Sequence, residues 1–347
     1  MKTIISKLMN SIQPIQMIGT QRSGSNLLRL LLNQYSEIVA PHPPHILQRF
    51  YPLLPAYGDL SAPENMARLT NDVSLLVECN PVPWKDIVLN REEIVRNCKS
   101  NNLIQIFRAV YDQMARCNSA SMWICKSMAN VAFAGQMEEQ GLSPLYIYLY
   151  RDGRDVACSF KKAIVGEKHV YHIAQQWRKD QLDSLQLSEK IESKRFFQIS
   201  YESLVSNPEQ EMARLSNFLQ LSYDPAIFDY YKSDESKNTS SAGKMWENVA
   251  KPIFGNNSKK YLKELTKEEI IIFESVAGDT LERLGYELEY PDLSKDFVIS
   301  KEDIQRYNEE NKILKEQSGM FADPEGVKLR EPQDKLIAAI KSRIISV

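Results

Sequence analysis

The stretch "MIGTQRSGSNLLRLLL" near the N-terminus constrains this chain more than any other part of its sequence. Gly19 and Gly24 stand at the glycine spacing of a Walker A loop, but the Lys and Ser/Thr that should follow are replaced by Ser25 and Asn26. The cation of this loop, Arg22, lies inside the turn instead of after it. The apolar residues before the loop predict a strand over 12–18, and the leucines after it have helical spacing. A strand–loop–helix unit aims backbone N–H groups and a helix N-terminus at one point, which suits an anion.

The loop lacks the hydroxyl group that a Walker A loop places on Mg²⁺, so it favours an anion held without a metal ion. A terminal phosphoryl group carries about two charges and calls for Mg²⁺, whereas a sulfuryl group carries one charge and needs only cationic side chains. The alternative is a strand-to-helix turn with a purely structural role.

The overall composition limits the kinds of molecule that this chain is expected to bind. The chain has 347 residues and a formal net charge of -2, so no general electrostatic attraction to nucleic acid is expected. No run of about 18 apolar residues predicts a membrane span, and we find no signal-peptide pattern, so the expected location is cytoplasmic. The five cysteines lack C-x-x-C spacing and the four histidines fall in two pairs, which predicts reduced thiols and no metal site.

Beyond the loop, strand-like and helix-like segments alternate. Residues 143–152, "SPLYIYLYRD", form a nearly continuous aromatic and β-branched run, typical of a parallel strand buried on both faces. "RFFQISYESL" predicts a further strand, and "NPEQEMARLSNFLQL" predicts a helix that Asn207 opens, with Pro208 in its first turn. This alternation predicts an α/β fold with an open, mainly parallel sheet flanked by helices.

A second cluster follows the buried strand in "YLYRDGRDVACSF", which carries Arg151, Arg154 and Ser159. Ligands of doubly wound sheets bind at the carboxyl ends of the strands, so we expect this cluster and the glycine loop to face one crevice. The alternative is that "RDGRD" is a turn closed by internal salt bridges, and it could hold for one of the two arginines.

Taken together, these motifs resemble the sulfotransferase superfamily, whose fold is P-loop-like. "RSGSNLLRLLL" looks like its 5′-phosphosulfate loop, "YRDGRDVACS" like its 3′-phosphate motif, and "YESLVSNPEQEMARLSNFLQL" like its tyrosine-bearing strand and following helix. "SKNTSSAGKMWENVAKPIFGNNSKKYLKELT" and "ERLGYE" resemble the C-terminal segment of the tyrosylprotein-sulfotransferase branch. The four matches follow the family's order from about Met17 to Tyr286.

The resemblance implies that the sulfuryl donor is 3′-phosphoadenosine 5′-phosphosulfate (PAPS), that the product is 3′-phosphoadenosine 5′-phosphate (PAP), and that no metal is used. It implies transfer to a hydroxyl or amine of a small-molecule, glycan or peptide acceptor. Carried over by position, the residues implied to bind PAPS are Arg22, Ser23, Gly24, Ser25 and Asn26 at the 5′-phosphosulfate, Arg151 and Ser159 at the 3′-phosphate, Tyr201 at the nucleotide, and the closing segment from Ser236 to Lys244 with Lys251. Arg22, Lys126 and Ser236 would stabilise charge during transfer. Asn26 departs from the usual Thr of the family, and the glycine-rich end of the cytosolic branch is absent.

Transfer to a hydroxyl also needs a base. Family members use Glu or His on the loop after the first helix, which here reads "VAPHPPHIL" and offers His42 and His45. Histidine suits the role because its ordinary pKa lies near neutral pH. The bacterial pattern favours His45, whereas gap-free alignment to the tyrosylprotein branch favours His42, so both stay open. Solvated histidines on a surface turn are the alternative.

The expected organisation is a sulfotransferase domain over 12–290, a helical acceptor cap inserted at about 50–120, and a charged helical extension over 291–347 without chemistry of its own. The extension is also the candidate interface of a homodimer. Two rival functions remain: a P-loop kinase or other nucleoside triphosphatase, and a non-catalytic nucleotide-binding protein of the same fold.

Overall fold

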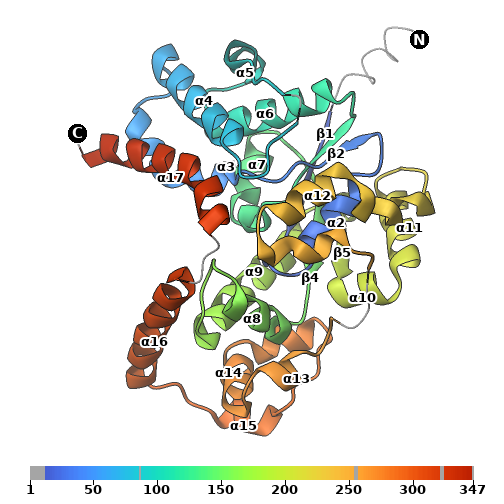
Figure 1. Ribbon diagram of the computed structural model, residues 1–347, viewed down its shortest axis with the longest axis vertical. Coiled ribbons are helices and arrows are strands. Elements are labelled where there is room, and N and C mark those ends of the chain that lie inside the picture. Colours follow the sequence, from blue (N-terminus) through green and yellow to red (C-terminus); the bar gives the residue numbers. More distant parts are fainter. Residues whose placement is uncertain (1–11, 86, 254–256, 321–323, 346–347) are drawn as a thin grey trace.

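A computed structural model describes residues 12–85, 87–253, 257–320 and 324–345 (Figure 1). At its centre lies a five-stranded sheet in the order β2-β3-β1-β4-β5, and every paired neighbour is parallel. The strands are β1 (Gln13–Ile18), β2 (Ile38–Val39), β3 (Met122–Cys125), β4 (Leu145–Tyr150) and β5 (Phe196–Ser200). The predicted open parallel sheet is therefore confirmed, and all five strands end at the same edge.

Helices cover both faces of the sheet, as β4 illustrates. Ile147 and Leu149 pack with the helix that follows the glycine loop, α2 (Ser25–Leu32), and with α11 (Pro208–Phe218). Tyr146 and Tyr148 point to the opposite face, where they meet α7 (Ala134–Glu139) and α9 (Val170–Lys190). Because successive strand residues alternate between faces, burial on both sides requires the continuous apolar run that the sequence carries.

Most elements agree with the expectations. The loop at 41–45 has no regular structure, and α11 begins with Pro208 in its first turn. One boundary differs: the segment expected as a strand through Leu204 leaves the sheet after Ser200 and continues as α10 (Tyr201–Ser206). The Ser200 side chain caps this helix by accepting a hydrogen bond from the Ser203 N–H, and the strand ends just before Tyr201.

The inserted region is helical, as expected. Its elements are α3 (Ile46–Phe50), α4 (Pro63–Glu78), α5 (Arg91–Asn97) and α6 (Leu103–Cys117), and they enclose an apolar core of their own. The remaining helices are α8 (Gly153–Lys162), α12 (Asp234–Ser241), α13 (Tyr261–Glu264), α14 (Lys267–Arg283), α15 (Pro291–Asp296), α16 (Lys301–Met320) and α17 (Pro324–Ile345).

The C-terminal segment returns to the inserted region. In Figure 1, α16 lies by α8 and α14, whereas α17 crosses beside α3 and α4. Ile340 is buried in the core of the insertion, the Gln333 Nε2 donates to the Leu76 carbonyl at 2.8 Å, and Arg343 pairs with Asp72 at 2.5 Å. The last helix is thus part of the wall around the inserted helices.

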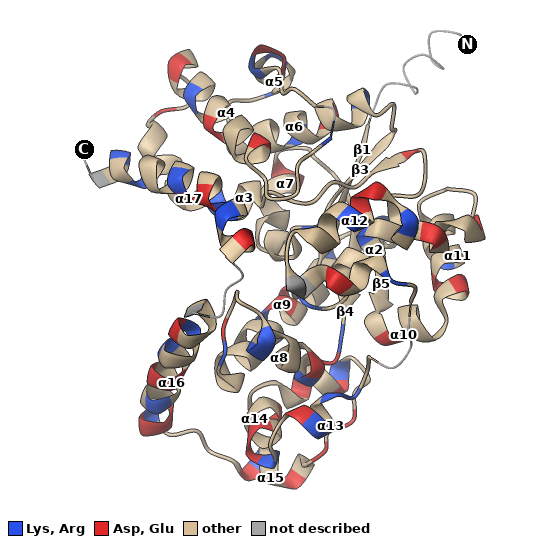
Figure 2. Ribbon diagram, viewed as in Figure 1, with Lys and Arg blue, Asp and Glu red and all other residues tan. Residues whose placement is uncertain are grey.

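Charged residues of both signs are interspersed over the outer helices, as Figure 2 shows for α4, α14 and α16. Within the described ranges, no helix is both long and apolar enough to cross a bilayer.

Candidate active site

A cavity of about 990 Å³ opens at the carboxyl edge of the sheet. Its residues come from the ends of all five strands: Arg22 after β1, His42 and His45 after β2, Lys126 after β3, Arg151 after β4 and Tyr201 after β5. Residues that lie far apart in the sequence therefore meet at the edge where the parallel topology predicts a ligand.

Two positions of the glycine loop have a backbone conformation and close contacts that leave no room for a side chain. Gly19 has a φ of 123°, and a Cβ there would lie 2.3 Å from the Leu149 carbonyl oxygen of the neighbouring strand. Gly24 has a φ of 89°, and a Cβ there would lie 2.4 Å from the Tyr201 ring. Arg22 also has a positive φ, 71°. Such backbone is rare in non-glycine residues and typically marks a functional turn.

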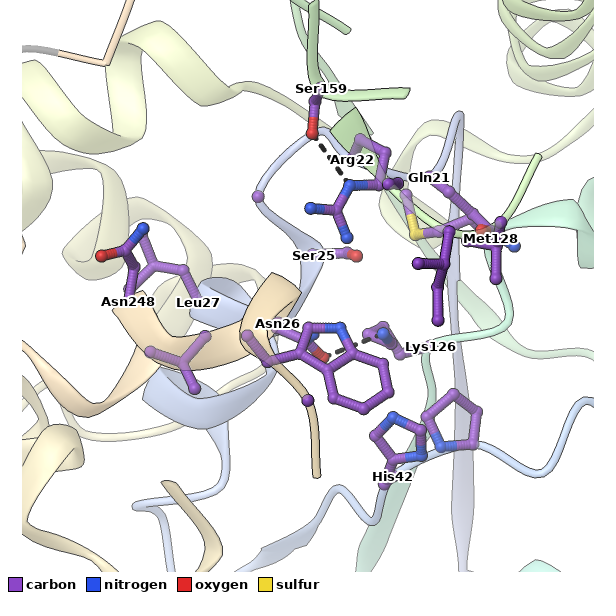
Figure 3. Close-up of a pocket in the computed structure, with 18 of the residues that line it drawn as sticks. Gln21, Arg22, Ser25, Asn26, Leu27, His42, Lys126, Met128, Ser159 and Asn248 are labelled. Atoms are coloured by element: carbon purple, nitrogen blue, oxygen red, sulfur yellow. Dashed lines mark hydrogen bonds between the residues drawn. The ribbon is translucent and has the colours of Figure 1, made fainter. Parts of the chain in front are cut away.

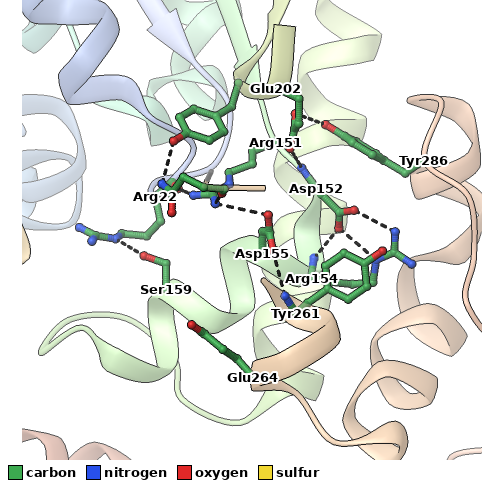
Figure 4. Close-up of polar contacts among 12 residues, drawn as sticks. Arg22, Arg151, Asp152, Arg154, Asp155, Ser159, Glu202, Tyr261, Glu264 and Tyr286 are labelled. Atoms are coloured by element: carbon green, nitrogen blue, oxygen red, sulfur yellow. Dashed lines mark hydrogen bonds and ion pairs between the residues drawn. The ribbon is translucent and has the colours of Figure 1, made fainter. Parts of the chain in front are cut away.

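The loop cation and the second cluster lie together, as predicted. The Arg22 Nε donates to the Ser159 Oγ at 2.9 Å (Figure 4). The Arg151 guanidinium lies 4.4 Å from the centroid of the Tyr201 ring. Burial and the charge of Arg151 lower the pKa of Arg22. Arg151 also pairs with Asp155 at 3.4 Å, and Asp155 and Glu264 line the same cavity. The two neighbouring guanidinium groups still make a site suited to an anion.

Arg154, the other arginine of "RDGRD", has a structural role. Its guanidinium pairs with Asp152 at 2.8 Å and with Glu274 at 2.7 Å, and it is 1% exposed (Figure 4). Glu274 also accepts backbone hydrogen bonds from Glu289 and Tyr290, so Arg154 anchors the segment after α14. The salt-bridge interpretation of the turn is correct for Arg154, and Arg151 also makes an ion pair within the turn, with Asp155 at 3.4 Å.

Lys126 reaches into the cavity from the end of β3. Its Nζ donates to the Asn26 Oδ1 at 2.9 Å (Figure 3). Burial, together with the charges of Arg29 and Arg22, lowers the pKa of Lys126 to about 7. The surroundings of Lys126 therefore destabilise its charged form, and a nearby anion would favour it.

Both histidines line the cavity, but their rings differ. The His42 Nε2 is buried without a hydrogen-bond partner among the described residues. The Trp246 ring packs against the His42 ring in an edge arrangement, with 5.1 Å between the ring centroids. The His45 Nδ1 lies 3.1 Å from the Ser127 Oγ, and His45 lines the cavity. His45 also has a φ of 59°, so the loop holds it in a strained conformation.

Burial and nearby cations lower the pKa of both imidazoles. Burial and then Lys126 and Arg49 lower the pKa of His45 to about 3. Burial, Lys126 and Arg29 lower the pKa of His42 well below its ordinary value. The lowered pKa keeps each ring neutral at neutral pH, and it also makes each ring a weaker base than an ordinary imidazole.

The closing segment lines the cavity with residues other than those expected. The Ser236 hydroxyl donates to the Val249 carbonyl at 2.5 Å, and this serine is not among the residues that line the cavity. Lys251 is exposed, and its ammonium bonds to the Asn248 side chain. The Lys244 side chain lies outside the described residues. Ser23 is buried behind the loop, with its Oγ unpaired in the described part of the chain.

The sequence analysis missed several lining residues. Asn257 donates to the Tyr201 hydroxyl at 2.7 Å, and its carbonyl accepts from Arg151. Others come from the inserted region and from the C-terminal helix: Gln48, Arg49, Asn80, Arg330, Gln333 and Asp334. None of them belongs to a recognisable local motif, because the fold brings them in from distant segments.

The sheet order, the loop after β1 and the cationic cavity at the carboxyl edge define a P-loop-like α/β protein. The model of the sulfotransferase family matches residues 14–225, more than half of the chain, so the chain belongs to the sulfotransferase family. The expected superfamily and fold class are thereby confirmed.

Relatives agree with this assignment. Protein-tyrosine sulfotransferase A of Caenorhabditis elegans is 21% identical over 275 residues, which cover 78% of this chain and 66% of that protein. This chain thus matches about two thirds of the relative's length.

Two solved structures share the fold. The sulfotransferase domain from the Synechococcus PCC 7002 olefin synthase superimposes with a TM-score of 0.51 at 20% identity, covering 77% of this chain and 95% of that domain. The sulfotransferase domain from the curacin biosynthetic pathway gives 0.50 at 21% identity, covering 80% and 100%.

Proposed function

We propose that this protein transfers a sulfuryl group from PAPS to a hydroxyl or amine acceptor, without a metal ion and with a histidine as base. The observation that carries the proposal is the meeting of Arg22, Lys126 and Arg151 in one cavity at the carboxyl edge of the sheet. Three basic side chains there supply the neutralisation that a Walker A loop obtains from its Lys and Mg²⁺.

One polar atom of the cavity wall fits an anionic nucleotide. In the described part of the chain, the Nε of Arg151, which lines the cavity, is buried without a hydrogen-bond partner. Buried polar groups normally find a partner, so this atom favours an external acceptor such as a phosphate oxygen. Arg22, Ser25 and Asn26 would hold the 5′-phosphosulfate. Arg151 and Ser159 would hold the 3′-phosphate. Tyr201 would lie beside the nucleotide.

The acceptor hydroxyl would give its proton to the His45 Nε2. The Ser127 Oγ, next to Nδ1, would accept its proton and leave the lone pair on Nε2, because a neutral imidazole carries one N–H. PAPS supplies the sulfuryl group, whose bond to the phosphate oxygen breaks as the bond to the acceptor oxygen forms. Lys126 and Arg22 would stabilise the departing phosphate.

The test is turnover of PAPS in EDTA. We expect PAP to form when a panel of phenols, sugars, amines and peptides is offered, and to form equally fast after Mg²⁺ is added. Production of PAP that required Mg²⁺, or ATP hydrolysis in place of PAPS turnover, would contradict the proposal. Tight PAP binding without turnover on any acceptor would instead favour the non-catalytic alternative.

The pKa of Lys126 predicts how donor affinity depends on pH. The ammonium of the free protein loses its proton above about pH 7, whereas a bound anion favours the charged form. PAP binding must therefore take up a proton above that pH, and the dissociation constant should rise by up to about tenfold per pH unit. Calorimetry between pH 6 and pH 9, run in buffers of different ionisation enthalpy, measures both effects.

The Lys126→Met variant should bind PAP more weakly and lose this slope. Lys179→Met, which removes an exposed lysine of α9, is the matched control and should retain the slope. A slope that persists in Lys126→Met would assign the proton to another group.

A further inference from the structure

The end of the cavity beyond the two histidines holds a half-buried arginine that is not used by the proposed donor site. Arg49 lies on α3 and lines the cavity. Within the described residues its guanidinium has no hydrogen bond and no ion pair; its interactions are the longer-range charges of Asp334 and Arg330. A guanidinium carries five N–H donors and no acceptor, so a partly buried one is suited to bind the oxygen atoms of a ligand.

Arg49 stands in a fixed relation to the proposed base. Its backbone N–H donates to the His45 carbonyl at 3.0 Å, so the two residues are one helical turn apart, and both line the same cavity. His45 is the left-handed cap that precedes α3, so the shared cavity lining, and not helical spacing, brings the two side chains together. A ligand that touches both must carry its reacting hydroxyl and a second group on one small frame.

A second guanidinium reinforces the positive charge at this end. Arg330 of α17 lies 5.7 Å over the Trp246 ring, and its charge lowers the pKa of both Arg49 and His42. The exposed Asp334, one turn further along α17, partly offsets Arg49. Two cations and one carboxylate thus line this end of the cavity.

The wall that carries Arg330 and Asp334 is held in place. Gln333 lies between Arg330 and Asp334 in the sequence and is 2% exposed. Its side chain donates a hydrogen bond to the Leu76 carbonyl of α4. The Arg330 Nη1 donates to the Gly326 carbonyl at 2.8 Å. An anion site formed by α3 and α17 would therefore need little rearrangement.

We infer that the acceptor is a small hydroxylated carboxylic acid, whose carboxylate binds Arg49, with support from Arg330, while its hydroxyl faces His45. This inference rests on the proposed sulfuryl transfer and adds the chemical class of the acceptor. It also assigns the C-terminal helix a part in acceptor recognition.

The test compares two probes of equal shape, 4-hydroxybenzoate and 4-hydroxybenzamide, by calorimetric titration of PAP-saturated protein. In both, a rigid ring holds the hydroxyl about one helical turn, ~5.4 Å, from the second group. We expect the acid to bind at least about tenfold more tightly than the amide, the size of effect expected of one charge-assisted contact.

The variants separate this site from the donor site. Arg49→Gln should bring the acid to the affinity of the amide and leave PAP affinity unchanged, whereas Asp334→Asn should tighten binding of the acid because a like charge is removed. Arg96→Gln, which removes an exposed arginine of α5 outside the cavity lining, is the matched control and should change nothing.

Equal affinities for acid and amide, an unchanged affinity in Arg49→Gln, or no binding of either probe would each overturn the inference. The titration is repeated without nucleotide, so that failure of PAP to bind counts against the proposed function and still leaves the carboxylate preference measurable.

Discussion

The His45→Ala variant is expected to lose turnover by a factor on the order of 10²–10⁴, the usual contribution of a positioned general base, while PAP affinity stays at the wild-type value. The reason is geometric: the His45 Nδ1 is engaged by Ser127, which leaves the opposite nitrogen available to the cavity. Steady-state kinetics with saturating PAPS measures the loss in kcat.

Because His45 has a positive φ, a second variant guards against a backbone effect. Asparagine tolerates the left-handed region, so His45→Asn should fold normally and be as inactive as the alanine variant. Ser127→Ala should lower kcat to a smaller extent, and Ser127→Thr, which keeps the hydroxyl, should restore it.

His42→Ala is the matched comparison within the same loop. The Trp84 and Asn80 side chains bond to the His42 carbonyl, which the substitution keeps, so the loop should persist. We expect a clearly smaller loss of turnover than in His45→Ala. Equal losses would leave the two histidines undistinguished, and full activity of His45→Ala would refute His45 as the base.

The Arg151→Ala variant is expected to bind PAP on the order of 100-fold more weakly, since the loss of charge-assisted hydrogen bonds to a phosphate costs about 3 kcal/mol. Arg151 is 5% exposed, lies over the Tyr201 ring and lines the cavity. Calorimetric titration with PAP measures the change.

Two further variants separate binding from folding. Arg151→Lys keeps the charge but loses the planar fork, and its affinity should fall between those of the wild type and the alanine variant. Arg178→Ala removes an exposed arginine paired with Asp279 outside the cavity and should leave PAP affinity unchanged. Wild-type PAP affinity in a folded Arg151→Ala protein would contradict the assignment.

The donor side of the cavity could be predicted from the sequence because its residues follow strands directly. Arg22 lies in a loop whose glycine spacing is visible in the letters, and Arg151 follows an apolar run that could only be a buried strand. Parallel topology then brings such residues to one edge without further information. The same reasoning could not tell Arg151 from Arg154, because the partner Glu274 is 120 residues away.

The acceptor side could not be predicted in this way. Arg330 and Asp334 lie on a charged helix without a motif, and its contact with α4 joins residues 257 positions apart. Ser236 was expected to contact the donor through its position in the family pattern, but its hydroxyl bonds to the Val249 carbonyl. Local patterns identify elements and their ends, whereas these placements depend on how distant elements pack.

The central claim is that the cavity binds the bisphosphate nucleotide of a sulfuryl donor without a metal ion. The most direct measurement is calorimetric titration of the purified protein with PAP in EDTA, beside ATP with Mg²⁺. The account predicts saturable PAP binding that is unaffected by EDTA and much tighter than binding of Mg²⁺·ATP. Binding of Mg²⁺·ATP alone, or of neither nucleotide, would contradict it.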